Sequence, residues 1–493
     1  MQNNETSDYR KIRLNKLEMV RELGINPYPS DFRKNAKSNE LAKKYVNLEA
    51  GEKTEDTYTV AGRIMSIRND GMFIDLHDDG GKIQVFSHKN NLNEVQQSLL
   101  KTFDLGDIIG VKGKIRSTPR GELTIDSVEL YLLSKSLLTL PEKYHGLHDV
   151  ETRYRQRYVD LIVNEKSREV LRKRSEIISA LRNFLIDQGY LEVETPMLHP
   201  IPGGAIAKPF VTHHNTLDME LYLRIAPELY LKKLLVGGLS EKLFEINRCF
   251  RNEGISTRHN PEFTSVEIYC AFVSFEEMIK LTEDTINYII KKINQDSIIT
   301  YGDKEINFTS PWKRASMSDL VLEATGVDFM KIHSDEEAHE VTNKLGVKVE
   351  ANFGWGKVLE AVFAEKVEHT LIDPIHITHL PTEISPLAKV CEHDTRITER
   401  FETYINGWEI ANGFSELNDP IDQYQRFEHQ DKVRESGDEE AHRIDHDFIT
   451  ALEYAMPPAG GLGIGIDRLV MILTDSISIR EVIAFPTLRL KDV

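Results

Sequence analysis

Twenty residues from Phe250 to Tyr269, FRNEGISTRHNPEFTSVEIY, combine the side-chain types that a nucleotide site needs. Arg251 carries a forked set of donors suited to a phosphate or a carboxylate. Arg258 and His259 could fold over distal phosphates, and Phe263 could supply a plate on which a purine ring stacks. Any one of these residues would also fit an exposed hairpin with surface ion pairs. Their combination favours a nucleotide site.

This stretch is expected to form a long hairpin, because the loop GISTRHNP lies between two apolar-alternating runs, KLFEINRCFRNE and FTSVEIY. Successive side chains of a strand point to opposite faces. Arg251 and Glu253 are therefore expected to share one face, and Glu267 and Tyr269 to share another across the hairpin.

A glycine-rich segment near the C-terminus, PPAGGLGIGIDRLVM, runs into an apolar helix that opens with Asp467 and Arg468. Glycine lets a ligand approach the backbone closely. The spacing matches neither of the glycine-rich phosphate motifs, GxxxxGK[ST] and strand-led GxGxxG. The informative residue is Arg468, at the junction of strand and helix, where it could point at a ligand. A tight strand-to-helix packing site is the alternative.

Three glutamates, Glu402, Glu409 and Glu416, recur every seven residues in FETYINGWEIANGFSEL. On a helix they would form a solvated stripe, but Gly407, Gly413 and the β-branched and aromatic residues disfavour a helix. On strands, separate glutamates can converge on one cleft. Carboxylates beside ATP usually bind Mg²⁺, which takes one or two carboxylates together with phosphate oxygens. A plain acidic surface is the alternative.

The cysteines argue against a zinc site. Cys249, Cys270 and Cys391 show no CxxC spacing and cannot form a disulfide framework, which is typical of a reducing compartment. The N-terminus has no apolar signal core, and no run approaches the roughly 18 apolar residues of a membrane span. A cytoplasmic protein with no membrane partner and no zinc is expected.

The 493 residues are too many for one core, so two or three domains are expected. The formal net charge of −18 argues against a nucleic-acid partner, but residues 8–44 carry ten Lys and Arg against five Asp and Glu. Leu14, Leu17 and Val20 repeat at helical spacing there and predict an amphipathic basic helix over 9–23. An RNA contact and a merely solvated helix remain open.

Five short alternating runs follow the basic helix: TYTVAGRIMSI, GMFIDLHD, GKIQVFS, IIGVKGKIRS and ELTIDSVELYLL. Turn signals such as Asn69-Asp70-Gly71 separate them, and a helical run, NLNEVQQSLLK, lies between the third and fourth. Five strands with a helix after the third is the chain order of an OB-fold β-barrel, a fold that commonly binds oligonucleotides. A small barrel without a ligand is the alternative.

The rest of the chain alternates strand-like runs with helices expected over 175–188, 275–294 and 356–370. This mixed order predicts an α+β domain with a largely antiparallel sheet flanked by helices. We therefore expect four parts: an N-terminal basic helical extension (1–55), an OB-fold domain (56–140), a linker (141–165) and a catalytic domain (166–493).

With these residues in view, the chain resembles the class II lysyl-tRNA synthetases of the bacterial type nearly end to end. Three ordered motifs carry the resemblance. The first resembles FLIDQGYLEVETPML, with Pro196 (about 184–198), the second FEINRCFRNEGISTRHNPEF (about 244–269) and the third GLGIGIDRL (about 460–473). Class I synthetases would need HIGH and KMSKS elements. HGLH at His145–His148 matches the first poorly, and nothing resembles the second.

The resemblance implies an antiparallel catalytic sheet, a homodimer with the first motif at its interface, and a two-step reaction. ATP and L-lysine would form lysyl-adenylate, and the lysyl group would then pass to the 3′ end of tRNA(Lys). Arg251 and Arg468 would be catalytic, and more than one Mg²⁺ would bind with ATP at Glu402 and Glu409. The implied ATP-binding residues are Arg251, Glu253, Arg258, His259, Asn260, Phe263, Glu402, Glu409 and Arg468.

The family pattern also implies a lysine pocket. Its residues would be Gly204, Glu228, Arg251, Glu267, Tyr269, Asn412, Phe414, Glu416 and Gly463. Glu228, Tyr269 and Glu416 would lie at the ε-ammonium, whose charge the pocket must neutralise because an unpaired buried charge is very costly. Aspartyl relatives carry a basic residue where this chain has Glu416, so the acidic residue favours lysine over aspartate or asparagine.

On the barrel, Phe73 and Gln84 match positions that read the anticodon by stacking and base-edge hydrogen bonds, and Glu122 is placed with them. The basic helix would contact the tRNA backbone. Three residues depart from the family pattern: Trp408, Ala411 and Ser240. Ala411 adds a methyl near Glu409 and is expected to shift the pocket slightly.

Two rival functions use the same fold. A lysyl-type ligase that modifies a protein would need the adenylation site but no anticodon-binding barrel. A catalytically silent tRNA-binding paralogue would be expected to have lost some of Arg251, Glu402, Glu409 and Arg468, yet all four are present.

Overall fold

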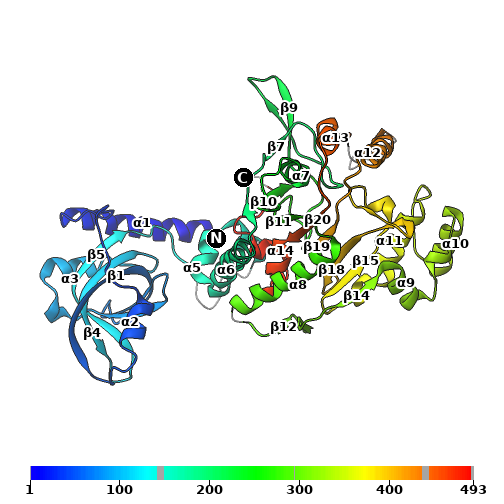
Figure 1. Ribbon diagram of the computed structural model, residues 1–493. Helices are drawn as coiled ribbons and strands as arrows, with labels where there is room; N and C mark the ends of the chain where they lie inside the picture. Colours follow the sequence, from blue (N-terminus) through cyan, green and yellow to red (C-terminus); the bar gives the residue numbers. More distant parts are fainter. Residues whose placement is uncertain (1, 142–148, 294, 436–442, 490–493) are drawn as a thin grey trace. The chain divides into compact units, whose positions relative to one another are not determined.

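A computed structural model describes residues 2–141, 149–293, 295–435 and 443–489 (Figure 1). The chain divides into two compact units, Met1–His148 and Asp149–Val493. Part of the expected linker, residues 142–148, lies outside the described residues, and the following part forms two short helices, α4 (Val150–Arg155) and α5 (Arg157–Val163). Within the described residues, no helix is long and apolar enough to cross a membrane.

The first unit contains the expected OB-fold barrel. Its strands close in the order β1-β2-β3-β5-β4, and helix α3 follows β3 in the chain. The turn between β1 and β2 uses left-handed backbone at Asn69, Asp70 and Gly71, with φ of 50°, 54° and 88°. The elements are α1 (Gln2–Glu22), α2 (Ser38–Lys44), β1 (Lys53–Arg68), β2 (Phe73–His77), β3 (Lys82–Phe86), η1 (Lys89–Asn91), α3 (Glu94–Leu100), β4 (Ile108–Ser117) and β5 (Leu123–Ser134).

The second unit is built on an eight-stranded sheet in the order β14-β15-β18-β19-β20-β11-β10-β6 (Figure 1). All neighbouring strands are antiparallel except the pairs β14–β15 and β10–β6. The expected antiparallel catalytic sheet is thus confirmed. Its strands are β6 (Leu191–Glu192), β10 (Lys242–Phe250), β11 (Glu262–Ala271), β14 (Lys313–Ser316), β15 (Ile375–Thr378), β18 (Arg400–Ile405), β19 (Trp408–Ser415) and β20 (Ala459–Gly465).

The two faces of this sheet have different partners. On β11, Val266 and Ile268 point into the main core, which α6 (Glu165–Asp187), α8 (Phe275–Lys292) and α14 (Ile466–Leu473) cover. The alternating residues of β11 point to the opposite face, where Tyr269 packs with apolar residues of α7 (Glu228–Val236). The period-2 pattern of the strand therefore places its polar side chains away from the main core.

A second hydrophobic core lies at the β14–β15 end of the main sheet. Helices α9 (Met317–Thr325), α10 (Asp335–Leu345) and α11 (Trp355–Lys366) pack around it with β14 and β15. The remaining elements are β7 (Leu198–His199), β8 (Val211–His214), β9 (Met219–Leu223), β12 (Ile298–Tyr301), β13 (Lys304–Asn307), η2 (Phe329–Lys331), η3 (Glu368–Thr370), η4 (Thr382–Ile384), β16 (Val390–Cys391), β17 (Asp394–Thr398), α12 (Pro420–Glu435), α13 (His446–Glu453) and α15 (Ile479–Val482).

Several expected boundaries were wrong. The helix expected over 175–188 begins ten residues earlier, at Glu165. The sequence pattern missed this start because the first turns are highly charged and lack an apolar period. The helix expected over 356–370 ends at Lys366, and a 3-10 turn follows. The first barrel strand begins at Lys53, so it crosses the expected boundary between 55 and 56.

Candidate active site

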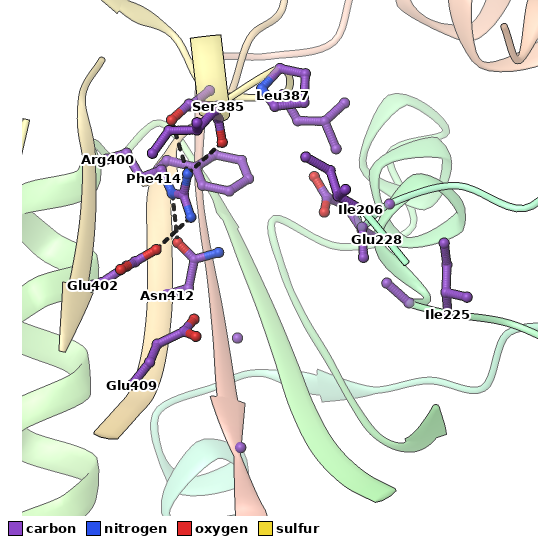
Figure 2. A pocket seen from close by; sticks show the side chains of 18 of the residues that line it. Ile206, Ile225, Glu228, Ser385, Leu387, Arg400, Glu402, Glu409, Asn412 and Phe414 are labelled. Carbon is purple, nitrogen blue, oxygen red and sulfur yellow. Dashed lines mark hydrogen bonds and ion pairs between the residues drawn. The ribbon is translucent and has the colours of Figure 1, made fainter. Parts of the chain in front are cut away.

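All seventeen residues expected to bind ATP, lysine or metal line one cavity of about 1210 Å³. They come from segments far apart in the sequence, and the sheet brings them together. The cavity residues are Gly204, Glu228, Arg251, Glu253, Arg258, His259, Asn260, Phe263, Glu267, Tyr269, Glu402, Glu409, Asn412, Phe414, Glu416, Gly463 and Arg468. In Figure 2, Glu228 and Ile225 lie on one side of this cavity, opposite Arg400, Glu402 and Asn412.

Strand register explains the convergence. Glu402 pairs with Asn412, Asn412 with Gly463, and Gly463 with Glu267, on four neighbouring strands. Directly paired residues of antiparallel strands project to the same face. A parallel row joins Arg400, Phe414, Gly461 and Tyr269. Two rows of paired residues therefore form much of the cavity floor.

The expected separation of the hairpin faces was wrong. Strand β10 ends at Phe250, and the backbone N–H of Arg251 donates to the carbonyl of Pro261, 2.8 Å away. The Arg251 guanidinium lies over the Phe263 ring, 5.1 Å from its centroid. Phe263 and Glu267 are four residues apart on β11 and so project to the same face, which places Arg251 on the same side of the hairpin as Glu267.

Two buried polar atoms in the part of the cavity near the hairpin have no hydrogen-bond partner among the described residues: Nε of Arg251 and Oδ1 of Asn260. The amide nitrogen of Asn260 is used, because it donates to the carbonyl of Glu262 at 2.6 Å. Buried polar atoms without a partner are costly. A ligand that offers both an anionic oxygen and a donor beside the Phe263 ring fits them.

Arg468 links the glycine-rich segment to the hairpin loop. Its Nη1 donates to the carbonyl of Glu409 at 2.7 Å, and its Nη2 lies 3.0 Å from Nε2 of His259. The neighbouring Asp467 accepts the backbone N–H of Thr264 at 2.7 Å and pairs with Arg174. These contacts fix the start of α14 against β11, which aims Arg468 at the cavity.

Arg400, which the sequence patterns did not single out, organises the acidic wall. Its guanidinium donates to Glu402 at 2.6 Å and to Oδ1 of Asn412 at 3.0 Å, and it also binds Ser385 (Figure 2). Burial raises the pKa of the Glu402 carboxyl to about 7, although Arg400 lowers it. The sequence did hold one signal for Arg400, because a residue two positions before Glu402 on a strand shares its face.

The acidic wall fits a magnesium ion that is bound together with a phosphate. Glu402 and Glu409 line the cavity, and Asn412, which follows Glu409 on β19, pairs directly with Glu402 on β18. No group of three His, Cys, Asp or Glu residues within the described ranges has the geometry to hold a metal by itself. Mg²⁺ commonly takes one or two carboxylates and completes its shell with phosphate oxygens and water.

The other end of the cavity is strongly acidic and buried. Glu228 and Glu416 are 7% and 1% exposed, and the Nζ of Lys232 lies 2.5 Å from a carboxylate oxygen of each. Glu267 accepts a hydrogen bond from the Tyr269 hydroxyl at 3.0 Å. Burial raises the pKa of Glu267 and of Glu416 to about 8. Lys232, like Arg400, was not foreseen, although its i,i+4 spacing from Glu228 on a helix was a signal.

Glycines admit these side chains. A Cβ at position 461 would lie 1.9 Å from the Glu416 carboxylate and 2.8 Å from the Tyr269 ring. Gly204 adopts a φ of +87°, and a Cβ there would lie 3.0 Å from that of Glu228. A Cβ at Gly463 would meet nothing closer than 3.8 Å.

The three residues that depart from the family pattern lie at different places in the second unit. Ala411 is buried in the main core and also lines the cavity, so the effect of its methyl on the pocket stays a prediction. Trp408 packs edge-on against Tyr301, 5.4 Å between ring centroids, and Arg258 lies over its ring. The Ser240 hydroxyl makes local bonds with Lys242.

In the barrel, Phe73 and Gln84, two of the residues expected to read RNA, lie on the neighbouring strands β2 and β3, and the third, Glu122, directly precedes β5. Phe73 opens β2 and packs on Phe86 of β3, with ring centroids 5.0 Å apart. Gln84 accepts a hydrogen bond from Thr124, and Glu122 pairs with Lys82 at 3.1 Å. The sequence patterns missed Phe86, whose ring also contacts His88 and Arg116.

Comparison with known proteins covers nearly the whole chain. A family described as tRNA synthetases class II (D, K and N) matches residues 149–489, and one described as OB-fold nucleic acid binding domain matches residues 58–133. The chain is 52% identical over 486 residues to a lysine–tRNA ligase of Rhizobium meliloti (strain 1021), which covers 99% of this chain and 98% of that protein. It is 52% identical over 494 residues to a lysine–tRNA ligase of Carboxydothermus hydrogenoformans, with 100% of both chains covered. A third relative, from Agrobacterium fabrum, is 50% identical over 486 residues, covering 99% of this chain and 97% of the relative.

Proposed function

The chain belongs to the class II tRNA synthetases, and from this premise we propose that it is a lysine–tRNA ligase. The full-length identity to proteins of that name supports this function. The observation that carries it is the acidic end of the cavity, where Glu228, Glu267 and Glu416 converge. A buried cluster of carboxylates suits a cationic side chain and opposes the acidic side chain of aspartate.

The reaction proceeds in two steps. A carboxylate oxygen of L-lysine attacks the α-phosphorus of ATP, the bond to the bridging oxygen breaks, and pyrophosphate leaves with lysyl-adenylate as the other product. The 3′-terminal ribose hydroxyl of tRNA(Lys) then attacks the lysyl carbonyl, and AMP leaves. Catalysis in the first step comes from positioning and charge neutralisation. The protein must therefore hold two anions, the lysine carboxylate and the triphosphate, against each other.

We assign these tasks to the side chains that line the cavity. Arg251 holds the lysine carboxylate and the α-phosphate. The adenine ring stacks on Phe263, the same ring that the Arg251 guanidinium contacts. Arg258 and Arg468 hold the distal phosphates. Glu253, His259 and Asn260 complete the nucleotide contacts. The buried Nε of Arg251 and Oδ1 of Asn260, both without protein partners, support this part of the assignment.

The family depends on ATP and on a metal, and we propose that more than one Mg²⁺ and no zinc serves this chain. Glu402 and Glu409 would hold the ion, and when bound it would neutralise charge on the phosphate oxygens. Arg400 orients Glu402 through its bond of 2.6 Å. The three described cysteines are buried and free, and two of them lie outside the cavity lining.

The lysine substrate would extend across the sheet rows. Its α-ammonium meets Glu267, its chain passes Gly204, Asn412, Phe414 and Gly463, and its ε-ammonium reaches Glu228, Tyr269 and Glu416. Two of these carboxyls have a pKa raised to about 8 by burial, which an approaching ammonium would reverse.

The barrel supports tRNA as the second substrate. We propose that 56–140 forms the anticodon-binding domain, that 1–55 contacts the tRNA backbone, and that 141–165 links them to the catalytic domain, 166–493. The Phe73–Phe86 aromatic pair suits stacking on unpaired bases, with Gln84 and Glu122 nearby for base-edge contacts.

We further propose a cytoplasmic homodimer. Large apolar side chains are exposed around the first motif and the following strands. They include Leu191 on β6, which is the edge strand of the main sheet. Exposed apolar groups beside a sheet edge commonly mark an interface. The group comprises Ile186, Leu191, Met197, Leu198, Val211, Leu217 and Met219.

Amino-acid-dependent exchange of pyrophosphate into ATP tests the function directly. A panel of twenty amino acids is assayed with Mg²⁺ and with EDTA. Exchange with lysine alone, lost with EDTA, is expected. Exchange with aspartate or asparagine would show that Glu228 and Glu416 are misassigned, and no exchange at all would favour a silent tRNA-binding paralogue. A ligase that modifies a protein is disfavoured by the barrel, which the matched relatives share over their full length.

A further inference from the structure

Lys232 is a fully buried cation that contacts two glutamates of the site proposed for a cationic substrate. It lies one helical turn after Glu228 on α7, and its side chain is 0% exposed. Its Nζ is 2.5 Å from Oε1 of Glu228 and 2.5 Å from Oε2 of Glu416. The same two carboxylates are proposed to receive the ε-ammonium of lysine. The chain therefore keeps an ammonium of its own on the groups that select the substrate.

The surroundings of Lys232 hold it in place. The rings of Phe414 and Phe448 lie 5.3 Å and 5.9 Å from its Nζ. A buried ammonium is stable only with anionic partners, and these two carboxylates raise its pKa against the opposing effect of burial. Lys232 is thus a fixed member of the cluster.

Two other carboxylates face this cluster, one in an ion pair and one in a hydrogen bond with a neutral hydroxyl. Glu245 of β10 pairs with Arg224 at 2.6 Å. Glu267 of β11 accepts the Tyr269 hydroxyl at 3.0 Å. When the ammonium of the substrate keeps Glu228 and Glu416 ionised, these two carboxylates share one internal cation, which leaves one negative charge for the substrate. Oε1 of Glu416 is buried and has no hydrogen-bond partner among the described residues.

We propose that Lys232 is a positioning and specificity-determining residue, which sets the charge of the pocket so that one added cation neutralises it. The internal ammonium holds both carboxylates in place and compensates one of them. The ε-ammonium of the substrate compensates the other. A neutral side chain in the same place would leave a buried charge unpaired, so the pocket rejects isosteres that lack the ammonium. This inference rests on the proposed lysine activation.

The charge count predicts a suppression that a merely structural role would not produce. In Glu416→Gln, Lys232 and Glu228 compensate each other, and the pocket has no charge for the substrate. The KM for lysine in ATP–pyrophosphate exchange should rise at least about 100-fold, as expected when one partner of a buried ion pair is removed. In Lys232→Met/Glu416→Gln, Glu228 is free to receive the substrate. The KM for lysine should then fall about tenfold or more below that of the single variant.

The second substitution is matched to its site. Methionine suits a position between two aromatic rings, because its side chain is apolar and similar in length. The control is Lys233→Met/Glu416→Gln. Lys233 is the next residue of α7, but it pairs with Asp447 at 2.7 Å, away from the two glutamates. This double variant should keep the high KM of Glu416→Gln, and the KM for ATP should stay near that of the wild type in all variants.

Thermal unfolding of each variant shows whether it folds. If Glu416→Gln does not fold, Glu228→Gln and Lys232→Met/Glu228→Gln provide the mirror-image pair. A double variant no better than its single parent would overturn the role of Lys232. A Lys232→Met variant that binds lysine more tightly than the wild type would also overturn it, because Lys232 would then compete with the substrate. Wild-type protein that exchanges with another amino acid and not with lysine would overturn the proposed function as well.

Discussion

The Nη2 atom of Arg468 lies 3.0 Å from Nε2 of His259, although 209 residues separate them in the chain. A guanidinium can only donate, so Nε2 accepts and the proton of the neutral ring is on Nδ1. Nδ1 lies 2.8 Å from the Ser256 hydroxyl, which accepts it. Burial, and after it the charge of Arg468, lower the pKa of His259. A neutral histidine thus connects the hairpin loop to the glycine-rich segment.

This contact predicts a selective effect on the nucleotide. In His259→Ala, Arg468 loses one of its two fixed partners, and the loop loses its tie to α14. The KM for ATP should rise about tenfold, as for the loss of a hydrogen bond to a charged group, while the KM for lysine stays within twofold. Pyrophosphate exchange at varied ATP and varied lysine measures both. His333→Ala, at an exposed position on the loop before α10, is the control. A larger change in the KM for lysine than for ATP would contradict the nucleotide role.

Arg251 should be far more critical, because its guanidinium faces both reacting anions. We expect Arg251→Ala to lower kcat for adenylate formation at least about 100-fold, the usual effect of removing one donor to a developing charge. The unfolding temperature should change little, since Nε of Arg251 has no protein partner to lose. Arg248→Ala is a matched control on the same hairpin, because Arg248 is a half-exposed residue that pairs with Glu262 at 3.4 Å. Near-normal adenylate formation by Arg251→Ala would refute its role.

The sequence predicted the site residues better than their arrangement. Arg251, Phe263 and Arg468 were recognisable because their types fit a nucleotide and their motifs are specific. The placement of Arg251 on the same side of the hairpin as Glu267 was not predicted, since β10 ends at Phe250 and Arg251 follows it in a loop. Register across four strands cannot be deduced from strand periodicity alone, because a slip of one residue reverses every side chain.

The two basic residues that were missed at the active site, Arg400 and Lys232, share a physical reason. Arg400 and Lys232 were not singled out because lone basic residues in sequence usually belong to solvated surfaces. Each becomes significant only through burial beside polar groups of another strand or segment, the Asn412 amide for Arg400 and the Glu416 carboxylate for Lys232. These two contacts are tertiary and need the folded sheet, whereas the spacing of Arg400 to Glu402 and of Lys232 to Glu228 was a local signal in the sequence.

The raised pKa of Glu402, about 7, predicts a pH-dependent need for magnesium. A carboxyl must lose its proton to bind a metal, so binding is favoured above this pKa and weakens below it. The Mg²⁺ concentration for half-maximal exchange should rise about tenfold between pH 8 and pH 6. In Glu402→Gln that concentration should be high and nearly independent of pH. Glu392→Gln, at an exposed turn, is the control and should follow the wild type. An equal pH dependence in Glu402→Gln and the wild type would assign the titration to another group.

Phe73 allows the two units to be tested separately. Its ring packs on Phe86, with centroids 5.0 Å apart, at the start of β2 and far along the chain from every residue of the cavity. If it stacks on an anticodon base, Phe73→Ala should lose about 1–3 kcal/mol of tRNA binding, which is about 5- to 150-fold in the KM for tRNA. Pyrophosphate exchange without tRNA should keep its wild-type rate. Tyr28→Ala removes an exposed aromatic ring elsewhere in the same unit and should leave both activities unchanged. Equal losses in charging and exchange would mean that Phe73 acts on the fold as a whole.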